Sequence, residues 1–350
     1  MTEYKPDFAA AFRCLASACP DSCCRQGWQI VIDPEHAAQY AALSGELGSR
    51  VRAAMTQTDG EATFAMDGGV CRLLDASGLC PIVSAMGEEG LCHICHTHPR
   101  FLEEYGATRE IHFSLSCPEA ARLALDRTNP IRFVRVQTDE PLDHPNSIDP
   151  AQYFALLAVR RLAVRLMQDR TLPISDRFVL LLRLAEQVQR RFDRKDYSAC
   201  RRLVRRWYGY DYRMRQFAKT LRGRLRRAPY AEDLALLCAM EHLTPEMTEL
   251  LPRLAETAEG ASAFDAAFSL QAEHLAVLWL WHYLPKAVND NDAAGKMKLA
   301  VFGWRFVRRA CLCMKKTTLS DVQHYAGLFA KEVEHSEENL NLFYRASKRI

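Results

Sequence analysis

Residues 14–28 read CLASACPDSCCRQGW and place four cysteines within eleven residues. Further along, residues 78–100 read GLCPIVSAMGEEGLCHICHTHPR and residues 115–119 read LSCPE. Nine of the thirteen cysteines in the chain lie between Cys14 and Cys117. Thiolates are soft ligands that bind zinc or iron–sulfur clusters, and packing alone rarely gathers so many. This concentration predicts that the first part of the chain folds around a metal site.

The composition is that of an ordinary globular protein, with 350 residues of which 49% are hydrophobic and 25% charged. The net charge of +3 is too small to imply a polyanionic partner. The first residues, MTEYKP, contain no apolar signal segment, and no stretch has transmembrane length. We therefore expect a cytoplasmic protein without a membrane partner. In a reducing compartment, clustered cysteines hold metal more often than they form disulfides, so a disulfide framework is the less favoured interpretation.

Eight cysteines are candidate metal ligands, namely Cys14, Cys19, Cys23, Cys24, Cys80, Cys92, Cys95 and Cys117. An iron–sulfur cluster typically uses four thiolates, and a structural zinc ion also needs four ligands. The number therefore permits one site with spare cysteines, or two sites. Only Cys92 and Cys95 have the CxxC spacing of a zinc knuckle, and the irregular spacing elsewhere favours a 4Fe-4S cluster over zinc. Cys71 lies outside the pattern.

Other side chains of this region are expected to stabilise the metal site without binding the metal. Because the cysteines already supply enough ligands, the histidines are expected to support the loops rather than bind the metal: His93, His96, His98 and His112. Arg100, after Pro99, is expected to offset thiolate charge. The later cysteines are expected to be buried structural thiols: Cys200, Cys238, Cys311 and Cys313.

The chain divides by character near residue 148. Before it, short strands are expected at 27–32, 62–66, 111–115 and 131–136, with helices in 35–57 and after Pro118. Residues 137–150 are polar and contain three prolines, as in a linker. The predicted domains are a cysteine-rich iron–sulfur or metal-binding region at 1–148 and an α-helical domain at 149–350.

The second part has helical periodicity throughout. Apolar residues at helical spacing predict helices at 151–169 and through 180–188, the latter capped by Ser175 or Asp176. Thr244 and Pro245 mark another helix start. Further helices are expected at 264–284, 296–314, 319–334 and 337–348. The predicted fold class is mainly α with small β elements.

Residues 183–227 concentrate arginines, among them Arg190, Arg201, Arg222, Arg224, Arg226 and Arg227, with Trp207, Tyr208, Tyr210 and Tyr212 interleaved. Three interpretations remain open. The segment is a nucleic-acid surface with arginines on phosphates and aromatics on bases, a docking surface for an acidic protein, or the outer face of amphipathic helices. The last is the commonest meaning of a charged run.

The order of the CC, GW, CP, LC, HPR and SCPE elements resembles the flagellin lysine-N-methylase family, over residues 8–120 by motif and more weakly over the helical remainder. A broader group of cysteine-rich, metal-chelating proteins shares the CC and CP elements. The resemblance implies methylation of lysine side chains in flagellin, S-adenosylmethionine as methyl donor, and a cysteine-bound iron–sulfur cluster. The alternatives are a non-enzymatic iron–sulfur or zinc protein in electron transfer or partner docking, and a nucleic-acid-binding protein.

The catalytic base and the S-adenosylmethionine pocket have no sequence signature here. No glycine-rich loop joins a strand to a helix, so a Rossmann nucleotide site is not supported. Glu103, Glu104 and Tyr105 are base candidates, but exposed loop residues are the simpler interpretation. The CxxxCxxC spacing of radical enzymes is absent, so we expect direct methyl transfer.

Overall fold

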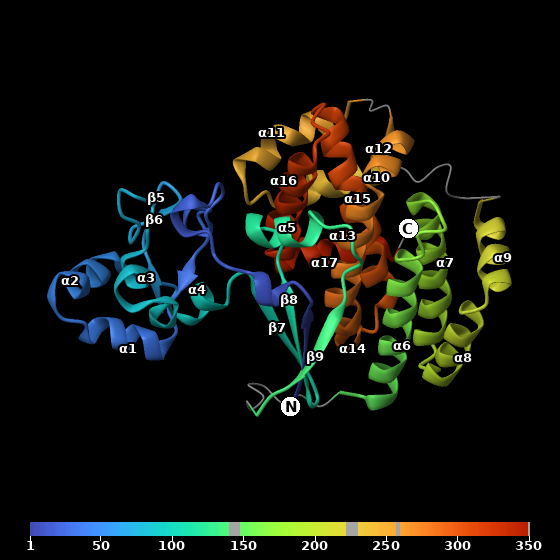
Figure 1. The fold of residues 1–350 in the computed structure, drawn as a ribbon, viewed down its shortest axis with the longest axis horizontal. Coiled ribbons are helices and arrows are strands. Elements are labelled where there is room, and N and C mark those ends of the chain that lie inside the picture. Colours follow the sequence, from blue (N-terminus) through green and yellow to red (C-terminus); the bar gives the residue numbers. More distant parts are fainter. Residues whose placement is uncertain (140–147, 222–229, 257–259, 349–350) are drawn as a thin grey trace. The chain divides into compact units, whose positions relative to one another are not determined.

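The computed structural model describes residues 1–139, 148–221, 230–256 and 260–348. It divides into two compact units, whose helices and strands are labelled in Figure 1. The cysteine unit comprises residues 11–101 and 113–120. The helical unit comprises residues 1–10, 102–112 and 121–350. The structure is mainly helical with short strands, which confirms the predicted fold class in its main feature.

The cysteine unit is built from small elements around one apolar cluster that includes Tyr40, Val51, Phe64 and Ile82. A three-stranded sheet has the order β2-β4-β3, and β5 pairs with β6 as a hairpin. Its elements are β2 (Ile30–Val31), α1 (Pro34–Ala42), α2 (Gly45–Ala54), β3 (Met55–Thr58), β4 (Glu61–Phe64), β5 (Met66–Asp67), β6 (Val70–Cys71), α3 (Pro81–Met86) and α4 (His93–Thr97).

The N-cap residue of α1 and one side chain within the helix tie α1 to the loop that carries Cys92. Asp33 caps α1 by accepting from the His36 N–H, and its second oxygen accepts from the His93 N–H at 2.8 Å. The buried Tyr40 hydroxyl donates to the Gly90 carbonyl at 2.7 Å. The start of α4 is therefore fixed from both sides of Cys92.

The helical unit begins with a four-stranded sheet of order β7-β8-β1-β9. The first strand of the chain, β1, pairs parallel with β8 and antiparallel with β9. Both partners lie more than a hundred residues further along the chain. The bounds are β1 (Thr2–Pro6), β7 (Arg100–Tyr105), β8 (Thr108–Phe113), α5 (Pro118–Leu125) and β9 (Phe133–Gln137).

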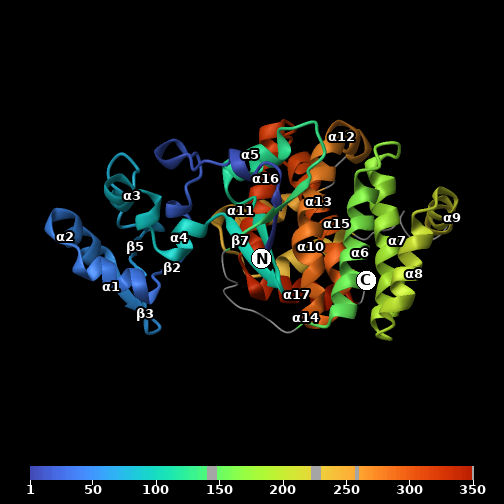
Figure 2. The ribbon, with the colours of Figure 1, turned by 60° about the horizontal axis from the view of Figure 1, so that its bottom comes forward.

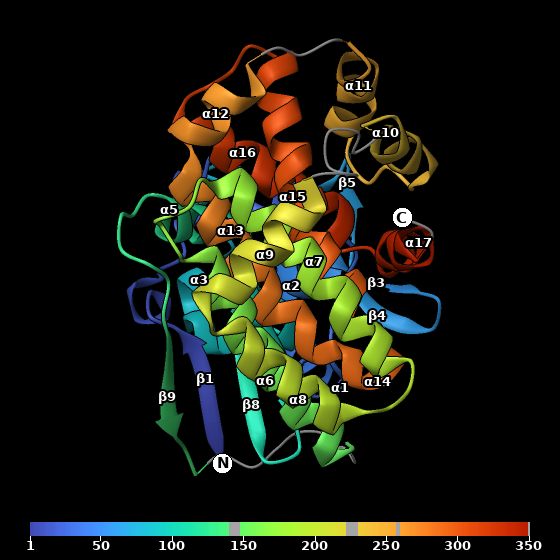
Figure 3. The ribbon, with the colours of Figure 1, turned by 90° about the vertical axis from the view of Figure 1, so that its right-hand side faces the viewer.

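Helices α13 and α15 form the centre of the helical unit, and α6 and α7 pack beside them (Figures 2 and 3). Most of α13 is buried on all sides, as an apolar central helix should be. The helices are α6 (Pro150–Met167), α7 (Ile174–Phe192), α8 (Tyr197–Trp207), α9 (Tyr210–Leu221), α10 (Tyr230–Ala239), α11 (Pro245–Leu254), α12 (Ala261–Ala267), α13 (Ser269–Tyr283), α14 (Ala287–Asp290), α15 (Ala293–Cys313), α16 (Leu319–Phe329), a π-helical turn (Ala330–Glu334) and α17 (Glu337–Ser347). None of the helices in the described ranges combines the length and apolarity needed to cross a membrane.

Several sequence-based expectations are confirmed, and the prediction of one helix cap is wrong. Thr244 caps α11 by accepting from the Met247 N–H at 3.2 Å. Helix α7, however, begins at Ile174 with Pro173 in the cap position, so Ser175 and Asp176 lie inside its first turn. The short strands β1, β3, β6 and β7 were not predicted. Arg222, Arg224, Arg226 and Arg227, and most of the expected linker (140–147), lie outside the described residues.

The two compact units do not divide the chain at residue 148. Residues 1–10 and 102–112 belong with the helices, because β1, β7 and β8 share one sheet. Compactness does not show which segments fold on their own. The division into 1–148 and 149–350 therefore stays a prediction.

Gly303 of α15 packs against Trp279 of α13. A Cβ atom added there would sit 2.5 Å from the indole ring of Trp279 and 3.0 Å from Phe329. Gly303→Ala is expected to lower the free energy of unfolding by about 1–3 kcal/mol through overpacking, although alanine is the better helix former. Urea unfolding would measure this loss. Gly209→Ala, whose Cβ meets nothing nearer than 3.4 Å, is the control, and equal losses in both variants would contradict the packing argument.

Glu334 ends the π-helical turn, and its carboxylate accepts from the Trp279 indole at 2.7 Å. Burial raises the pKa of this carboxyl from 4.5 to about 7. Because the folded-state pKa is the higher one, the stabilising contribution is complete below about pH 4.5 and is lost as the pH rises through about 7. The unfolding free energy of Glu334→Gln, relative to that of the wild type, is expected to rise by on the order of 2 kcal/mol when the pH is raised from about 5 to about 8. Urea unfolding at both pH values tests this, and a pH-independent difference would refute it.

Candidate metal centre

A cavity of about 210 Å³ lies within the cysteine unit and gathers most of the candidate ligands. Ile30, Phe64, Leu73 and Ile82 supply apolar walls. The cysteines that line it are Cys14, Cys19, Cys23, Cys24, Cys71, Cys80, Cys95 and Cys117. Seven of the eight predicted ligands therefore share one cavity, together with Cys71, which the spacing pattern had left out.

Cys92, the eighth candidate, is fully buried and does not line the cavity. It precedes α4, and Cys95 lies within that helix, so the CxxC spacing brings the two thiols together on one turn. Their interaction lowers the pKa of the Cys92 thiol and raises that of Cys95 well above its ordinary value. The two thiols therefore differ in how readily they ionise.

The loop geometry places other thiols at the starts of helices. Cys80 precedes Pro81 of α3, and Cys117 precedes Pro118 of α5. Burial raises the pKa of both thiols, while backbone N–H groups of the following turn partly offset it by favouring the thiolate. Proline at the first helical position suits the helix start, which explains why a CP pair occurs at both places.

The remaining thiols differ in their readiness to ionise. Burial raises the pKa of Cys19, and that of Cys71 to about 11. The adjacent Cys23 thiol lowers the pKa of Cys24 to about 7 and keeps its own proton. Metal ions bind thiolates and release these protons, so a set of buried, mutually coupled thiols has the chemistry of a metal-binding donor set.

The thiols share a cavity without forming a coordination sphere. Among the residues that the structure describes, no three His, Cys, Asp or Glu side chains lie close enough together to hold a metal ion. All thirteen cysteines carry free thiols. The donor chemistry fits a metal or cluster, and the assignment of ligands stays a prediction.

The four histidines separate into different environments. His96 and His98 line the cavity, and His98 packs edge-on against Trp28 with 5.5 Å between ring centroids. Burial lowers the pKa of His98 to about 4, so it is neutral at physiological pH. His93 is exposed, with its backbone bound to Asp33. His112 lies in the helical unit, where it stacks on His282 at 4.3 Å.

Arg100 lines the cavity and is held by aromatic rings. Its guanidinium lies 5.0 Å from the centroid of the Phe12 ring and 5.5 Å from that of Phe113. Such cation–π contacts fix the charge beside the thiols. That Arg100 offsets thiolate charge stays a prediction, and unchanged metal content in Arg100→Ala would count against it.

The base candidates are not exposed loop residues, because all three lie on β7. Glu103 pairs with Lys286 at 2.5 Å, Glu104 pairs with Arg109 at 2.9 Å, and Tyr105 is buried. The simpler interpretation given above was therefore wrong about their setting. None of the three lines the thiol cavity, and a role for any of them as the base stays a prediction.

The later cysteines are mostly as expected. Cys200, Cys311 and Cys313 are buried, whereas Cys238 is exposed on α10, which corrects the expectation for that residue. It lies one residue before the end of that helix.

The arginine-rich segment forms an amphipathic helix in its described part. In α8, Cys200, Leu203, Val204 and Trp207 are buried while Arg201, Arg202, Arg205 and Arg206 are exposed. Arg213 of α9 pairs with Asp169 at 2.8 Å. This arrangement favours the interpretation as the outer face of amphipathic helices. The nucleic-acid surface and the docking surface for an acidic protein stay predictions.

Comparison with known proteins finds a family and a small set of relatives. Residues 160–349 match the FliB lysine N-methylase C-terminal domain. The chain is 31% identical over 134 residues to "Lysine-N-methylase" of Salmonella choleraesuis and of Salmonella typhimurium, an alignment that covers 36% of this chain and 33% of each relative. It is also 31% identical over 134 residues to "Flagellar biosynthetic protein FliU" of Salmonella muenchen, covering 78% of that protein. The chain thus spans about a third of the length of the two lysine-N-methylases. No solved structure matches.

Proposed function

Because the chain belongs to the FliB lysine N-methylase family, we propose that it methylates lysine side chains of a protein, with S-adenosylmethionine as methyl donor and flagellin as substrate. The observation that carries this proposal is the family match over more than half of the chain, residues 160–349. The relative whose name is flagellar supports a flagellar substrate. The proposed compartment is the cytoplasm.

The reaction needs an unprotonated lysine amine. A lysine side chain has an ordinary pKa near about 10.4, so a methylase must desolvate the ammonium or supply a base. The amine nitrogen then attacks the methyl carbon of the donor, the carbon–sulfur bond breaks, and the proton on nitrogen passes to the base. The products are N-methyl-lysine and S-adenosylhomocysteine. This displacement is balanced without any redox partner.

We also propose that thiolates of the cysteine region hold a 4Fe-4S cluster, with zinc as the alternative metal. The candidate ligands are the eight predicted cysteines, and the thiol cavity supports the assignment because seven of them line it. A bound cluster would supply cross-links between loops that otherwise have few regular elements. The metal-binding region is proposed to comprise residues 1–148.

Transfer of tritium-labelled methyl groups from S-adenosylmethionine to flagellin tests the enzymatic proposal. Incorporation that requires the protein, and that is lost when flagellin lysines are acetylated beforehand, is the expected result. Absence of incorporation with active donor would refute the proposal and favour a non-enzymatic metal protein.

A product assay separates direct displacement from radical chemistry. S-adenosylhomocysteine is expected to form in proportion to methyl groups transferred, with no 5′-deoxyadenosine. Stoichiometric 5′-deoxyadenosine would show that the donor is cleaved reductively, which contradicts the mechanism given above.

A further inference from the structure

An open groove of about 750 Å³ lies in the helical unit, lined by residues of α6, of the loop after α6, of α9 and of α13. Figure 3 views the flank on which α6, α8 and α9 pack side by side. Three arginines line the groove, Arg161, Arg165 and Arg213, and the acidic residue in its described lining is Asp169. The lining therefore carries two positive charges more than it balances.

The two unbalanced charges belong to Arg161 and Arg165. The Arg213 guanidinium binds the Asp169 carboxylate at 2.8 Å, so this pair is neutral. Arg161 and Arg165 are exposed on successive turns of α6, and neither has a hydrogen-bond or ion-pair partner within the described part of the chain. Like charges four residues apart destabilise a helix, and an anion bound between them would relieve that repulsion. The groove thus has the electrostatics of an anion site.

Arg165 is held in position without using its donors. Its guanidinium lies over the Tyr208 ring, 5.1 Å from the ring centroid. A guanidinium placed over an aromatic ring keeps the N–H groups at its edge available. That planar fork matches a carboxylate, which it binds through two parallel hydrogen bonds. Because the side chain is already positioned, less entropy is lost when a carboxylate binds.

The indole of Trp281, which also lines the groove, has no face on which a nucleobase could stack. Its ring stacks on Phe133 with 3.6 Å between centroids, and the Arg160 guanidinium lies 3.7 Å from the Trp281 centroid. Two groups this close to one centroid cannot share a face, so both faces are occupied. Binding of single-stranded nucleic acid relies on free aromatic faces. The groove therefore favours the carboxylates of a protein over a nucleic acid.

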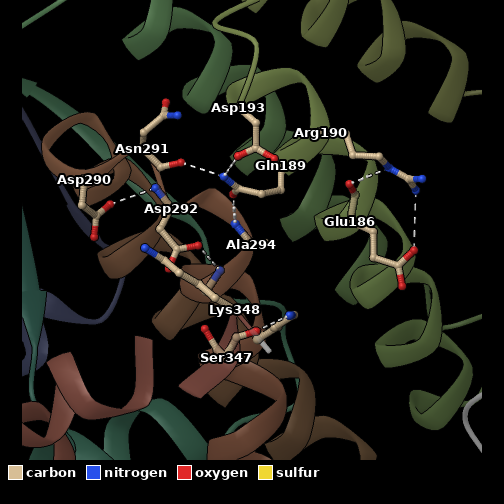
Figure 4. A pocket seen from close by; sticks show the side chains of 12 residues that line it. Glu186, Gln189, Arg190, Asp193, Asp290, Asn291, Asp292, Ala294, Ser347 and Lys348 are labelled. Atoms are coloured by element: carbon tan, nitrogen blue, oxygen red, sulfur yellow. Dashed lines mark hydrogen bonds and ion pairs between the residues drawn. The ribbon is translucent and has the colours of Figure 1, made fainter. Parts of the chain in front are cut away.

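A second polar cavity of the helical unit, drawn in Figure 4, shows how paired charges differ from this arrangement. Arg190 lies 3.6 Å from the Glu186 carboxylate, and Asp290 pairs with Lys296 at 2.6 Å. Charges satisfied in this way offer little attraction to a ligand. Arg190 is consequently an exposed arginine of the same unit that serves as a matched control for Arg161 and Arg165.

We propose that the groove binds an acidic segment of a protein through Arg161 and Arg165, and that this protein is the one whose lysines the chain methylates. The identity of the partner rests on the proposed function, whereas the recognition of carboxylates does not. A docking contact away from the reacting lysine is made equally in the ground state and in the transition state. Such a contact lowers KM and leaves kcat nearly unchanged.

Calorimetric titration of a hexaglutamate peptide into the full chain tests the groove. The double variant Arg161→Gln/Arg165→Gln is expected to raise the Kd about tenfold or more, since it removes two charge-assisted contacts. Both arginines are exposed, and unchanged thermal unfolding verifies the fold. Arg190→Gln is expected to bind the peptide as the wild type does. An unchanged Kd in the double variant, or an equal loss in Arg190→Gln, would overturn the proposal.

Methyl transfer to flagellin tests the identity of the partner. The double variant is expected to raise the KM for flagellin about tenfold and to change kcat by less than about twofold. If the wild type methylates flagellin and the double variant has the same KM, the assignment of the partner is overturned while the proposed function survives. If the wild type transfers no methyl group but binds the peptide through the two arginines, the proposed function falls and the acidic-peptide site stands.

A short oligothymidylate supplies the last arm of the test. The wild type is expected to bind it more weakly than hexaglutamate at the same salt concentration. If the oligonucleotide binds more tightly, and the double variant loses that binding, the groove holds nucleic acid and the proposal is overturned.

Discussion

Cys95→Ser is expected to lower the iron content of the anaerobically purified protein by at least about tenfold. Replacing residues that merely hydrogen-bond metal ligands already lowers metal affinity by about tenfold or more, and loss of a ligand should cost no less. Cys95 is the cysteine of the CxxC turn that lines the thiol cavity. Serine is similar in size but is a poor ligand for iron or zinc. The brown colour and the absorbance near about 400 nm should disappear with the iron.

Cys238→Ser is the matched control, because this thiol is exposed on α10 and does not line the cavity. It is expected to keep its iron. Equal iron in the two variants and the wild type would show that Cys95 is not a ligand. Zinc in place of iron, lost only in Cys95→Ser, would keep the site and change the metal.

Glu110→Ala is expected to cost about 3–5 kcal/mol of unfolding free energy, the largest stability effect foreseen for a single residue here. Glu110 of β8 is fully buried and receives both terminal nitrogens of Arg160 at 2.6 and 2.7 Å. The Arg160 guanidinium also lies 3.7 Å from the centroid of the Trp281 ring. Removing the carboxylate leaves the Arg160 guanidinium buried without a counter-charge from Glu110. Its contacts with the Trp281 ring and the Trp281 carbonyl do not replace that charge.

Denaturant unfolding followed by circular dichroism measures this loss. Glu256→Ala is the control, because its pair with Arg253 at 3.3 Å is half exposed and such pairs contribute about 0–1 kcal/mol. A loss below about 1 kcal/mol in Glu110→Ala would contradict the view that this pair joins the sheet to α6.

The helices of the second part could be predicted from sequence because their apolar positions recur at helical spacing. α17, found at 337–347, was expected at 337–348. The strands were harder, because β1 is only five residues long and its pairing with β8 and β9 depends on segments far along the chain. Local patterns carry no information about such partners.

The candidate site likewise combines features that local sequence patterns predict with features that depend on the folded chain. Spacing identified seven cysteines that line one cavity, since CC, CP and CxxC pairs are local features. Cys71 was missed because it stands alone in the sequence, and only the β5–β6 hairpin turns it inward.

The most direct test of the central claim is mass spectrometry of flagellin after incubation with this protein and trideuteromethyl-labelled S-adenosylmethionine. The account predicts peptides heavier by one or more trideuterated methyl groups, with fragment ions placing the label on lysine side chains. Unlabelled lysines, or label on other residue types, in a reaction with metal-replete protein would contradict the claim that this chain is a protein-lysine methylase.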